Sequence, residues 1–202
     1  MAAISKPWYL ERYNTMLSDK RTYKRIIRED LLDYYRHEAL ERIVQTVMSG
    51  SFSDQVSEFL LASDEDAAIP EFYAIPKVYK TPWTLRPIVP SHSWVTRRAS
   101  EVCDFTLREF HKKEFPWIVD STREVISRLR EHTVTRSDST WLVTGDVESF
   151  YTNVPTAETI DHLRVALSGC PSSHGVDHSR IPDLLETVMA CNYFEFNDVS
   201  YL

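Results

Sequence analysis

Glycine is scarce in this sequence of 202 residues, which contains four glycines and three cysteines. The signatures G-x-x-x-x-G-K-[ST], G-x-G-x-x-G and G-x-S-x-G do not occur, and neither does H-E-x-x-H. Phosphate-cradling loops and nucleophile elbows need glycine where the backbone turns tightly or approaches a ligand. The sequence therefore excludes the P-loop NTPases, the dinucleotide-binding folds, the α/β-hydrolases and the zinc proteases that carry these motifs.

Long hydrophobic runs and a secretory leader are also absent. No apolar stretch approaches the ~18 residues that cross a bilayer, and the N-terminus MAAISKPWYLERYNTM lacks the apolar core of a signal peptide. Cys103, Cys170 and Cys191 are odd in number and widely spaced, which indicates neither a disulfide framework nor a zinc ribbon. We expect an intracellular protein, nuclear or cytoplasmic or both, with free thiols and no membrane contact.

Acidic residues are missing from one part of the chain although they dominate the whole. The net charge of −7 argues weakly against nucleic acid as a partner. Between residues 72 and 100, however, there is no Asp or Glu, and the charge of +5 comes from Lys77, Lys80, Arg86, Arg97 and Arg98. Because salt screens charges over ~8–10 Å, such a block can bind anions locally on an acidic protein. The alternative is a chance gap in the acidic residues.

The hydrophobic pattern predicts a mixed α/β chain of the α+β type. Apolar residues recur at helical spacing in segments that predict helices over 23–48, 55–61, 93–113, 156–167 and 182–191. A further short helix should follow residues 120–122 and bury Val125, Ile126 and Leu129. The β-rich runs 72–75 and 85–89 predict a hairpin rimmed with Lys and Arg, and 193–196 predicts a strand before an Asn197–Asp198 turn.

The strongest predicted strand is 141–147, an apolar run that ends on the carboxylate of Asp146. We expect this strand to be buried, with Asp146 at the sheet edge, where open α/β sheets hold ligands. A carboxylate there suits Mg²⁺, which binds one or two carboxylates together with substrate phosphates. The alternative is that Asp146 caps the following turn, and a single Asp does not by itself make a two-metal site.

Four segments stand out when they are taken together: YNTMLSDKRTYKRI at 13–26, FYAIPKVYKTPWTLRPIV at 72–89, DVESFYTNVP at 146–155 and FNDVSYL at 196–202. In this order they resemble the reverse transcriptase domain of Penelope-like retroelements, over residues 10–202. The resemblance implies a partial right-hand polymerase fold. Its parts would be a helical N-terminal section at 1–65, a fingers-like region with the basic hairpin at 66–120, and part of the palm with motif A at 121–202.

The same resemblance implies RNA-directed DNA synthesis, with an RNA template, a DNA primer and deoxynucleoside triphosphates as partners. Asp146 would be the first catalytic carboxylate and would bind two Mg²⁺ ions, with the Val147 carbonyl as a further ligand. Tyr151 would be the steric-gate aromatic that occupies the position of a ribose 2′-OH. The alternative for Tyr151, or for its neighbour Phe150, is a core aromatic.

The basic residues of the hairpin also acquire roles from the resemblance. Arg86 matches the fingers arginine that holds the incoming triphosphate with its planar fork. Lys77 and Lys80 are both candidates for a second cation, and the sequence does not decide between them; the alternative is a solvated hairpin rim. Arg97 and Arg98 are candidates for sequence-independent contacts with template or primer phosphates.

The later family motifs do not occur in these 202 residues. There is no Tyr-x-Asp-Asp and no Asp-Asp pair, and the thumb and the rest of the palm are missing, so we expect that this chain alone does not extend a primer. A second hypothesis is a non-catalytic, domesticated fragment that binds RNA or a partner protein. A third is a zinc module, because the spacing C-x3-H-x3-H-x12-C offers zinc-compatible ligands at Cys170, His174, His178 and Cys191.

Overall fold

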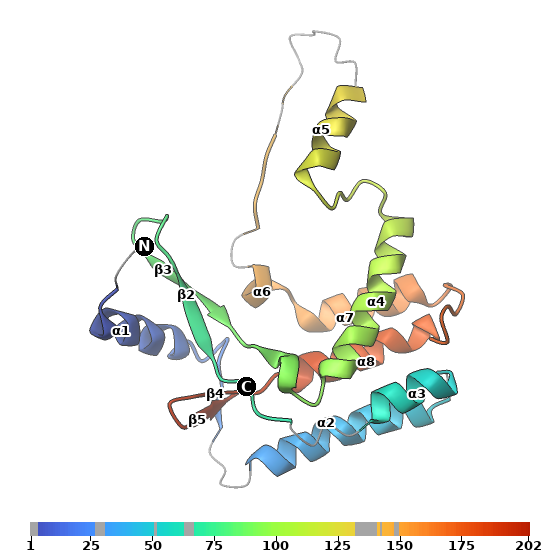
Figure 1. Cartoon of the computed structure of the whole chain (residues 1–202), viewed down its shortest axis with the longest axis horizontal. Helices are drawn as coiled ribbons and strands as arrows, with labels where there is room; N and C mark the ends of the chain where they lie inside the picture. Colours follow the sequence, from blue (N-terminus) through green and yellow to red (C-terminus); the bar gives the residue numbers. More distant parts are fainter. Residues whose placement is uncertain are drawn as a thin grey trace.

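The computed structural model describes residues 4–26, 31–50, 52–62, 67–131, 141, 143–147 and 150–202, without the side chains of residues 31, 32, 151 and 152. Most of this part is helical, and its strands form two small antiparallel sheets (Figure 1). The chain is therefore of the mixed α+β class that the sequence predicts. No helix of the described part is long and apolar enough to cross a membrane.

A helical body surrounds the largest apolar core. Its helices are α2 (Leu31–Met48), α3 (Asp54–Leu61), α4 (Arg97–Glu114), α7 (Thr156–Leu167) and α8 (Ile181–Ala190). Gly50, with φ of +84°, turns the chain between α2 and α3, and the Ser53 side chain accepts a hydrogen bond from the Val56 amide at the start of α3. The buried side chains that meet between these helices include Ile43, Val47, Leu60, Ala99, Cys103, Leu167, Ile181 and Leu184.

The larger sheet joins the two ends of the chain. Its strand order is β1 (Arg25–Ile26), β5 (Val199–Tyr201) and β4 (Phe194–Phe196), all antiparallel. Asn197 and Asp198 have φ of +49° and +59°, as a two-residue hairpin turn requires, so the predicted turn is confirmed. A single bridge between Glu71 and Glu195 connects β4 to the segment that leads into the smaller sheet.

The smaller sheet is the predicted basic hairpin, formed by β2 (Tyr73–Lys77) and β3 (Thr84–Ile88). Helix α1 (Lys6–Leu17) packs against it, and the aromatic rings of Tyr13, Phe72 and Phe194 meet in a second core beneath both sheets. This contact buries Ala74 and partly buries Leu85, whereas the aromatic Tyr73 and the β-branched Ile75, on the other side of β2, are 45% and 48% exposed. The local β propensity predicts the hairpin correctly, although other residues cover the core.

Helix α5 (Thr122–Glu131) lies at the end of an arm that extends beyond α4, away from the helical body (Figure 1). The sequence predicts this helix correctly but predicts its packing wrongly. Val125, Ile126 and Leu129 are 38%, 45% and 56% exposed, and no residue of α5 is buried. The apolar stripe is real, but in the described part of the chain no element covers it.

The predicted strand at 141–147 is wrong for the residues that the structure describes. Residues 141 and 143–147 are not in a strand, and Trp141 and Val143 are 85% and 84% exposed. A strand is stable only when a neighbouring strand accepts its backbone hydrogen bonds and a core covers its side chains. A high local β propensity supplies neither partner.

Two predicted helix starts are also wrong. The helix predicted from residue 23 begins at Leu31, because Arg25 and Ile26 form β1 and pair with Ser200 and Tyr201. Ser93 lies in a short 3₁₀ helix, Ser91–Ser93, and α4 begins only at Arg97. The remaining short elements are α6 (Phe150–Asn153) and a second 3₁₀ turn, His178–Arg180.

Candidate functional site

The register of the β2–β3 hairpin separates its residues into two faces. Ile75 pairs with Arg86, and Lys77 pairs with Thr84, so these four side chains lie on the same face. This face is exposed at Ile75 and Arg86, while Ala74 on the opposite face is 3% exposed and belongs to the aromatic core. The exposed face therefore carries two cations on a strand pair whose other face is fixed by packing.

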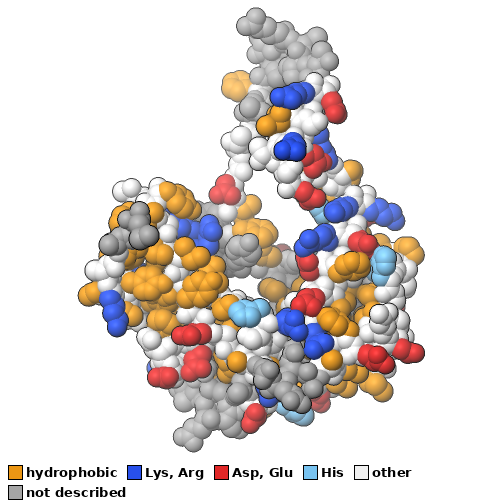
Figure 2. All heavy atoms as spheres, viewed as in Figure 1, with side chains coloured by type: hydrophobic (Ala, Val, Ile, Leu, Met, Phe, Trp, Pro, Cys, Tyr) orange, Lys and Arg blue, Asp and Glu red, His pale blue; other side chains and the backbone are white. Residues whose placement is uncertain are grey.

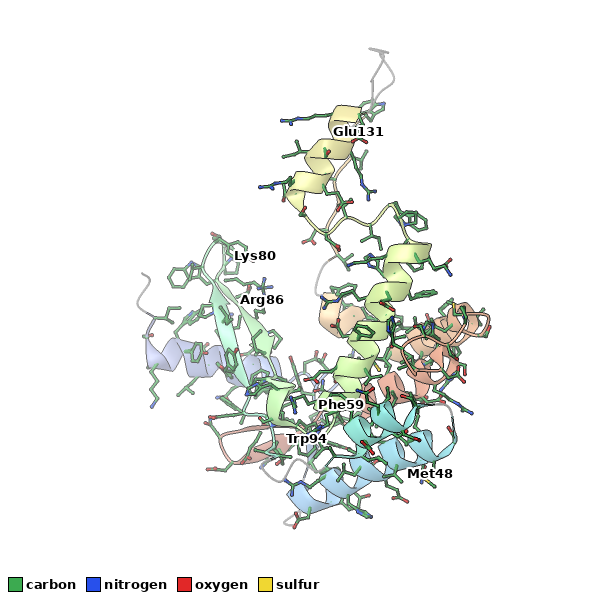
Figure 3. All side chains as sticks on the ribbon, turned by 45° about the vertical axis from the view of Figure 1, so that its right-hand side comes forward. Met48, Phe59, Lys80, Arg86, Trp94 and Glu131 are labelled. Carbon is green, nitrogen blue, oxygen red and sulfur yellow. The ribbon has the colours of Figure 1, made fainter. Side chains whose placement is uncertain are left out.

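Lys77 and Lys80 occupy different positions relative to Arg86. Lys77 is opposite Thr84, and Thr84 precedes Arg86 by two residues on β3, so Lys77 and Arg86 are diagonal neighbours. Diagonal neighbours in an antiparallel pair are about 7–8 Å apart, which long side chains can span. Lys80 lies beyond the last strand residue, in the turn at the tip of the hairpin (Figure 3). The geometry thus favours Lys77 over Lys80 as the partner of Arg86 toward a single anion.

Aromatic residues lie near the tip of the hairpin and on α1 beside it. Tyr79 and Trp83 near the tip are 72% and 40% exposed. Trp83 contacts the ring of Trp8 edge-on, at 5.9 Å between centroids, and the Arg12 guanidinium lies 5.7 Å from the Trp8 ring. Figure 2 shows hydrophobic side chains gathered on this side of the molecule, over α1 and the hairpin.

Two tyrosines of α1 fix the position of β2. Ala74 lies opposite Pro87, which has no amide proton. The backbone amide and carbonyl of Ala74 point to the other edge of β2, away from β3. There the Ala74 amide donates to the Tyr13 hydroxyl, and the Tyr9 hydroxyl donates to the Ala74 carbonyl. Burial, together with the hydrogen bond that Tyr13 donates to the Tyr9 hydroxyl, raises the pKa of Tyr13, which therefore stays neutral. The sequence does not single out Tyr9 and Tyr13 as positioning residues, and their i, i+4 spacing is the one local signal that places them on the same side of a helix.

Arg97 and Arg98 have contacts inside the protein. Arg97 forms an ion pair with Glu101, at 3.2 Å between Nη1 and Oε1. Arg98 donates to the Phe59 carbonyl at 3.3 Å, and its guanidinium lies 5.3 Å from the Phe59 ring, so it connects α4 to α3. The structure thus gives Arg98 a structural role. Contact of either residue with nucleic acid stays a prediction.

Asp146 and Val147 precede α6 in an exposed, non-strand segment. Val147 is 63% exposed. Within the described residues, no ion pair joins Asp146 to Lys77, Lys80 or Arg86. Tyr151 belongs to α6, but its side chain lies outside the described part, so the steric-gate assignment stays a prediction.

The four zinc-compatible side chains are engaged separately. The Cys170 thiol donates to the Ala166 carbonyl, the His174 Nε2 lies 3.4 Å from the Glu109 carboxylate, and His178 Nε2 lies 2.8 Å from the Ser173 hydroxyl. Cys191 is buried beneath Trp94, whose indole donates to the Cys191 carbonyl at 2.9 Å. Among the described residues, no group of three His, Cys, Asp or Glu side chains could hold a metal ion.

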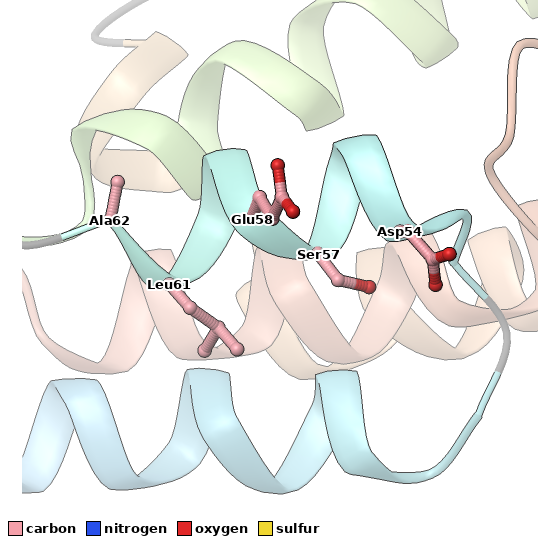
Figure 4. A pocket seen from close by; sticks show the side chains of 5 residues that line it. All are labelled: Asp54, Ser57, Glu58, Leu61 and Ala62. Carbon is pink, nitrogen blue, oxygen red and sulfur yellow. The ribbon is translucent and has the colours of Figure 1, made fainter.

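The surface also contains a shallow depression on α3, shown in Figure 4. All the residues that line it belong to this helix and the residue after it: Asp54, Ser57, Glu58, Leu61 and Ala62. Since no polar groups from other elements converge there, the depression does not have the architecture of a small-molecule site. The hairpin face with Lys77 and Arg86 is the better candidate.

The chain matches no protein-family model, no curated protein and no solved structure.

Proposed function

We propose that this chain is the fingers and the first part of the palm of an RNA-directed DNA polymerase, a reverse transcriptase. The observation that carries the proposal is the juxtaposition of Lys77 and Arg86 on the exposed face of the hairpin. It agrees with the resemblance of the 72–89 and 146–155 segments to polymerase motifs. The partners of this function are an RNA template, a DNA primer and deoxynucleoside triphosphates.

The hairpin would bind the triphosphate of the incoming nucleotide. Arg86 offers a planar fork of donors that matches two phosphate oxygens at once, and Lys77 adds a compact charge beside it. In phosphoryl transfer, negative charge spreads over the oxygens of the transferred group, so fixed cations lower the barrier by stabilising that charge. The packing of β2 on Tyr9 and Tyr13 holds both cations in place before the nucleotide arrives.

Asp146 and Val147 would supply oxygen ligands to Mg²⁺. A carboxylate and a carbonyl fit the preference of this ion for hard oxygen ligands combined with substrate phosphates. When bound, Mg²⁺ would supply charge stabilisation to the attacking and leaving oxygens. Asp146 is exposed and would be accessible to such a complex. These 202 residues contain no Asp-Asp pair that could provide a second catalytic carboxylate. Primer extension therefore requires a further segment that supplies this carboxylate.

Primer extension tests the role of Asp146, with the chain joined to a palm and thumb segment that carries Tyr-x-Asp-Asp. Asp146→Ala should reduce extension by about 100-fold or more, because a shared metal ligand is lost. Asp161→Ala is the control, since Asp161 is an exposed carboxylate of α7. Activity of the Asp146 variant within about tenfold of the unmutated protein would contradict the assignment.

The second candidate is RNA binding without catalysis. The observation that favours it is that Lys77, Lys80 and Arg86 are positioned independently of Asp146. In this case, fluorescence anisotropy with an RNA oligonucleotide should show binding that weakens as salt rises. Replacing one phosphate-contacting cation should lower the log–log salt slope by about 0.7–0.9, and Asp146→Ala should leave binding unchanged.

A further inference from the structure

Helix α5 presents an apolar stripe with arginines beside it. Val125, Ile126 and Leu129 lie within about one third of the helix circumference, since 3.6 residues make one turn. Arg123 and Arg130 follow on one flank of this stripe, and both are exposed. Arg128 on the other flank is held by the Glu124 carboxylate and the Pro116 carbonyl. Among the described residues, no ion pair involves Arg123 or Arg130.

The position of α5 keeps this stripe away from the cores of its own chain. The helix lies at the end of the arm that extends beyond α4, and Glu131 marks its far end (Figures 1 and 3). None of its residues is buried. An amphipathic helix in a soluble protein ordinarily covers such a stripe against another element.

A second apolar surface lies on the opposite part of the molecule, across α2 and α3. Leu40, Val44 and Met48 follow one another at i, i+4 and i+8 along α2, and they are 36%, 42% and 77% exposed. On the neighbouring helix α3, Leu61 is 43% exposed and lies in the shallow depression of Figure 4. We call these four side chains, with the depression beside them, the α2–α3 face.

The α2–α3 face is bordered by carboxylates that form no ion pair within the described residues. Asp54 and Glu58 line the depression, and no ion pair involves either of them in the part of the chain that the structure describes. Residues 31–66 contain eight Asp and Glu against two Arg and no Lys, so this section carries −6 of the total charge of −7. The face therefore suits an apolar helix that brings arginine or lysine along its side.

We propose that α5 of one copy of the chain docks on the α2–α3 face of a second copy. The apolar stripe of α5 would cover Val44, Met48 and Leu61, and its arginines would meet the carboxylates of Asp54 and Glu58. The two surfaces are complementary in both polarity and charge, and they lie at opposite ends of the same molecule. The inference is independent of the proposed polymerase function.

The proposed contact is small. A helix of ten residues in a shallow groove belongs to the class of interfaces below about 1,200 Å², which form weak and concentration-dependent complexes. A reciprocal exchange, in which each copy offers α5 to the other, would double this area and close a two-fold dimer. The association should weaken with salt, because exposed charges form its rim.

Sedimentation of the full chain over a range of concentrations and at two salt concentrations tests the proposal. The average mass of the unmutated protein should rise from that of one chain, 23.6 kDa, toward two. Glu58→Arg and Arg130→Glu should each hold the mass at one chain. An equal mixture of the two variants should rise again, because the reversed charges of one variant match those of the other.

The controls change the same charges elsewhere. Glu11→Arg and Lys20→Glu alter exposed residues of α1 and the loop after it, and they should associate like the unmutated protein. Circular dichroism verifies that every variant is folded. A mass of one chain at all concentrations for the unmutated protein would overturn the proposal. Equal association of all variants, or failure of the mixture to recover, would overturn it as well.

Discussion

The Tyr13 hydroxyl accepts the backbone amide of Ala74 across 61 residues of sequence, and both groups are buried. This one contact fixes β2 to α1 at the point where Pro87 on β3 cannot donate an amide proton. The hairpin that carries Lys77 and Arg86 is therefore positioned from its outer edge by helix α1. Positioning of this kind matters for a cationic site, because the charges must be in place before the ligand binds.

Tyr13→Phe should lower the free energy of unfolding by about 1–3 kcal/mol, since it leaves the buried Ala74 amide without an acceptor. Urea denaturation followed by circular dichroism measures this change. Tyr79→Phe is the matched control, because Tyr79 is 72% exposed, and its effect should stay within about 0.5 kcal/mol. Equal stability of the two variants would show that the Tyr13 hydrogen bond does not hold the hairpin.

Gly175 and Gly50 provide a test that separates steric overlap from backbone strain. Both have positive φ, +76° and +84°. A Cβ on Gly175 would overlap the Ser53 hydroxyl and lie 2.7 Å from the Ser53 Cβ, whereas a Cβ on Gly50 would meet nothing within 4 Å. Gly50→Ala should cost about 1 kcal/mol from strain alone. Gly175→Ala should cost about 1–3 kcal/mol more, since the loop must shift away from the start of α3.

Burial raises the pKa of the Cys103 thiol from 9.0 to about 12, and it raises the pKa of Cys191 to about 11. In the unfolded chain these thiols ionise near pH 9, while in the folded chain they stay protonated. The unfolded state therefore binds fewer protons above pH 9, and the free energy of unfolding falls as pH rises from 9 toward 12. Each thiol should contribute a loss of about 1 kcal/mol at pH 10.

Urea denaturation at pH 7 and pH 10 measures this loss. Cys103→Ala should remove the Cys103 part of the difference, although the variant is less stable at both pH values because a buried sulfur is lost. Cys170→Ala, at a half-buried position, should leave the difference unchanged. A Cys103 variant with the full pH dependence would contradict the assignment of the effect to this thiol.

Local signals predicted most of the secondary structure. The spacing of apolar residues gave α3, α7 and α8 nearly to the residue, and the turn residues Asn197 and Asp198 gave the β4–β5 hairpin. Two of the failures share a cause, which is that strand pairing depends on contacts distant in sequence. Residues 25 and 26 read as helix but pair with β5 about 175 residues away, and the 141–147 run lacks a partner strand among the described residues.

The sequence also predicts part of the candidate site, namely the basic hairpin and Arg86. The absence of acid between 72 and 100 identified the basic hairpin, and the resemblance singled out Arg86. The choice between Lys77 and Lys80 could not be made from sequence, because it depends on which residues of β2 and β3 are opposite each other. The register settles which lysine shares the face of Arg86, but the role of that lysine toward a triphosphate stays a prediction.

The central claim, that the hairpin binds the triphosphate of an incoming nucleotide, is tested most directly by nuclear magnetic resonance. A deoxynucleoside triphosphate with Mg²⁺ is titrated into the full chain while the backbone amides are followed. The proposal predicts shifts in the amides of 73–88 that are lost in Arg86→Ala, strongly reduced in Lys77→Ala and less affected in Lys80→Ala. Hairpin amides that do not respond, or that respond equally in Arg86→Ala, would contradict it.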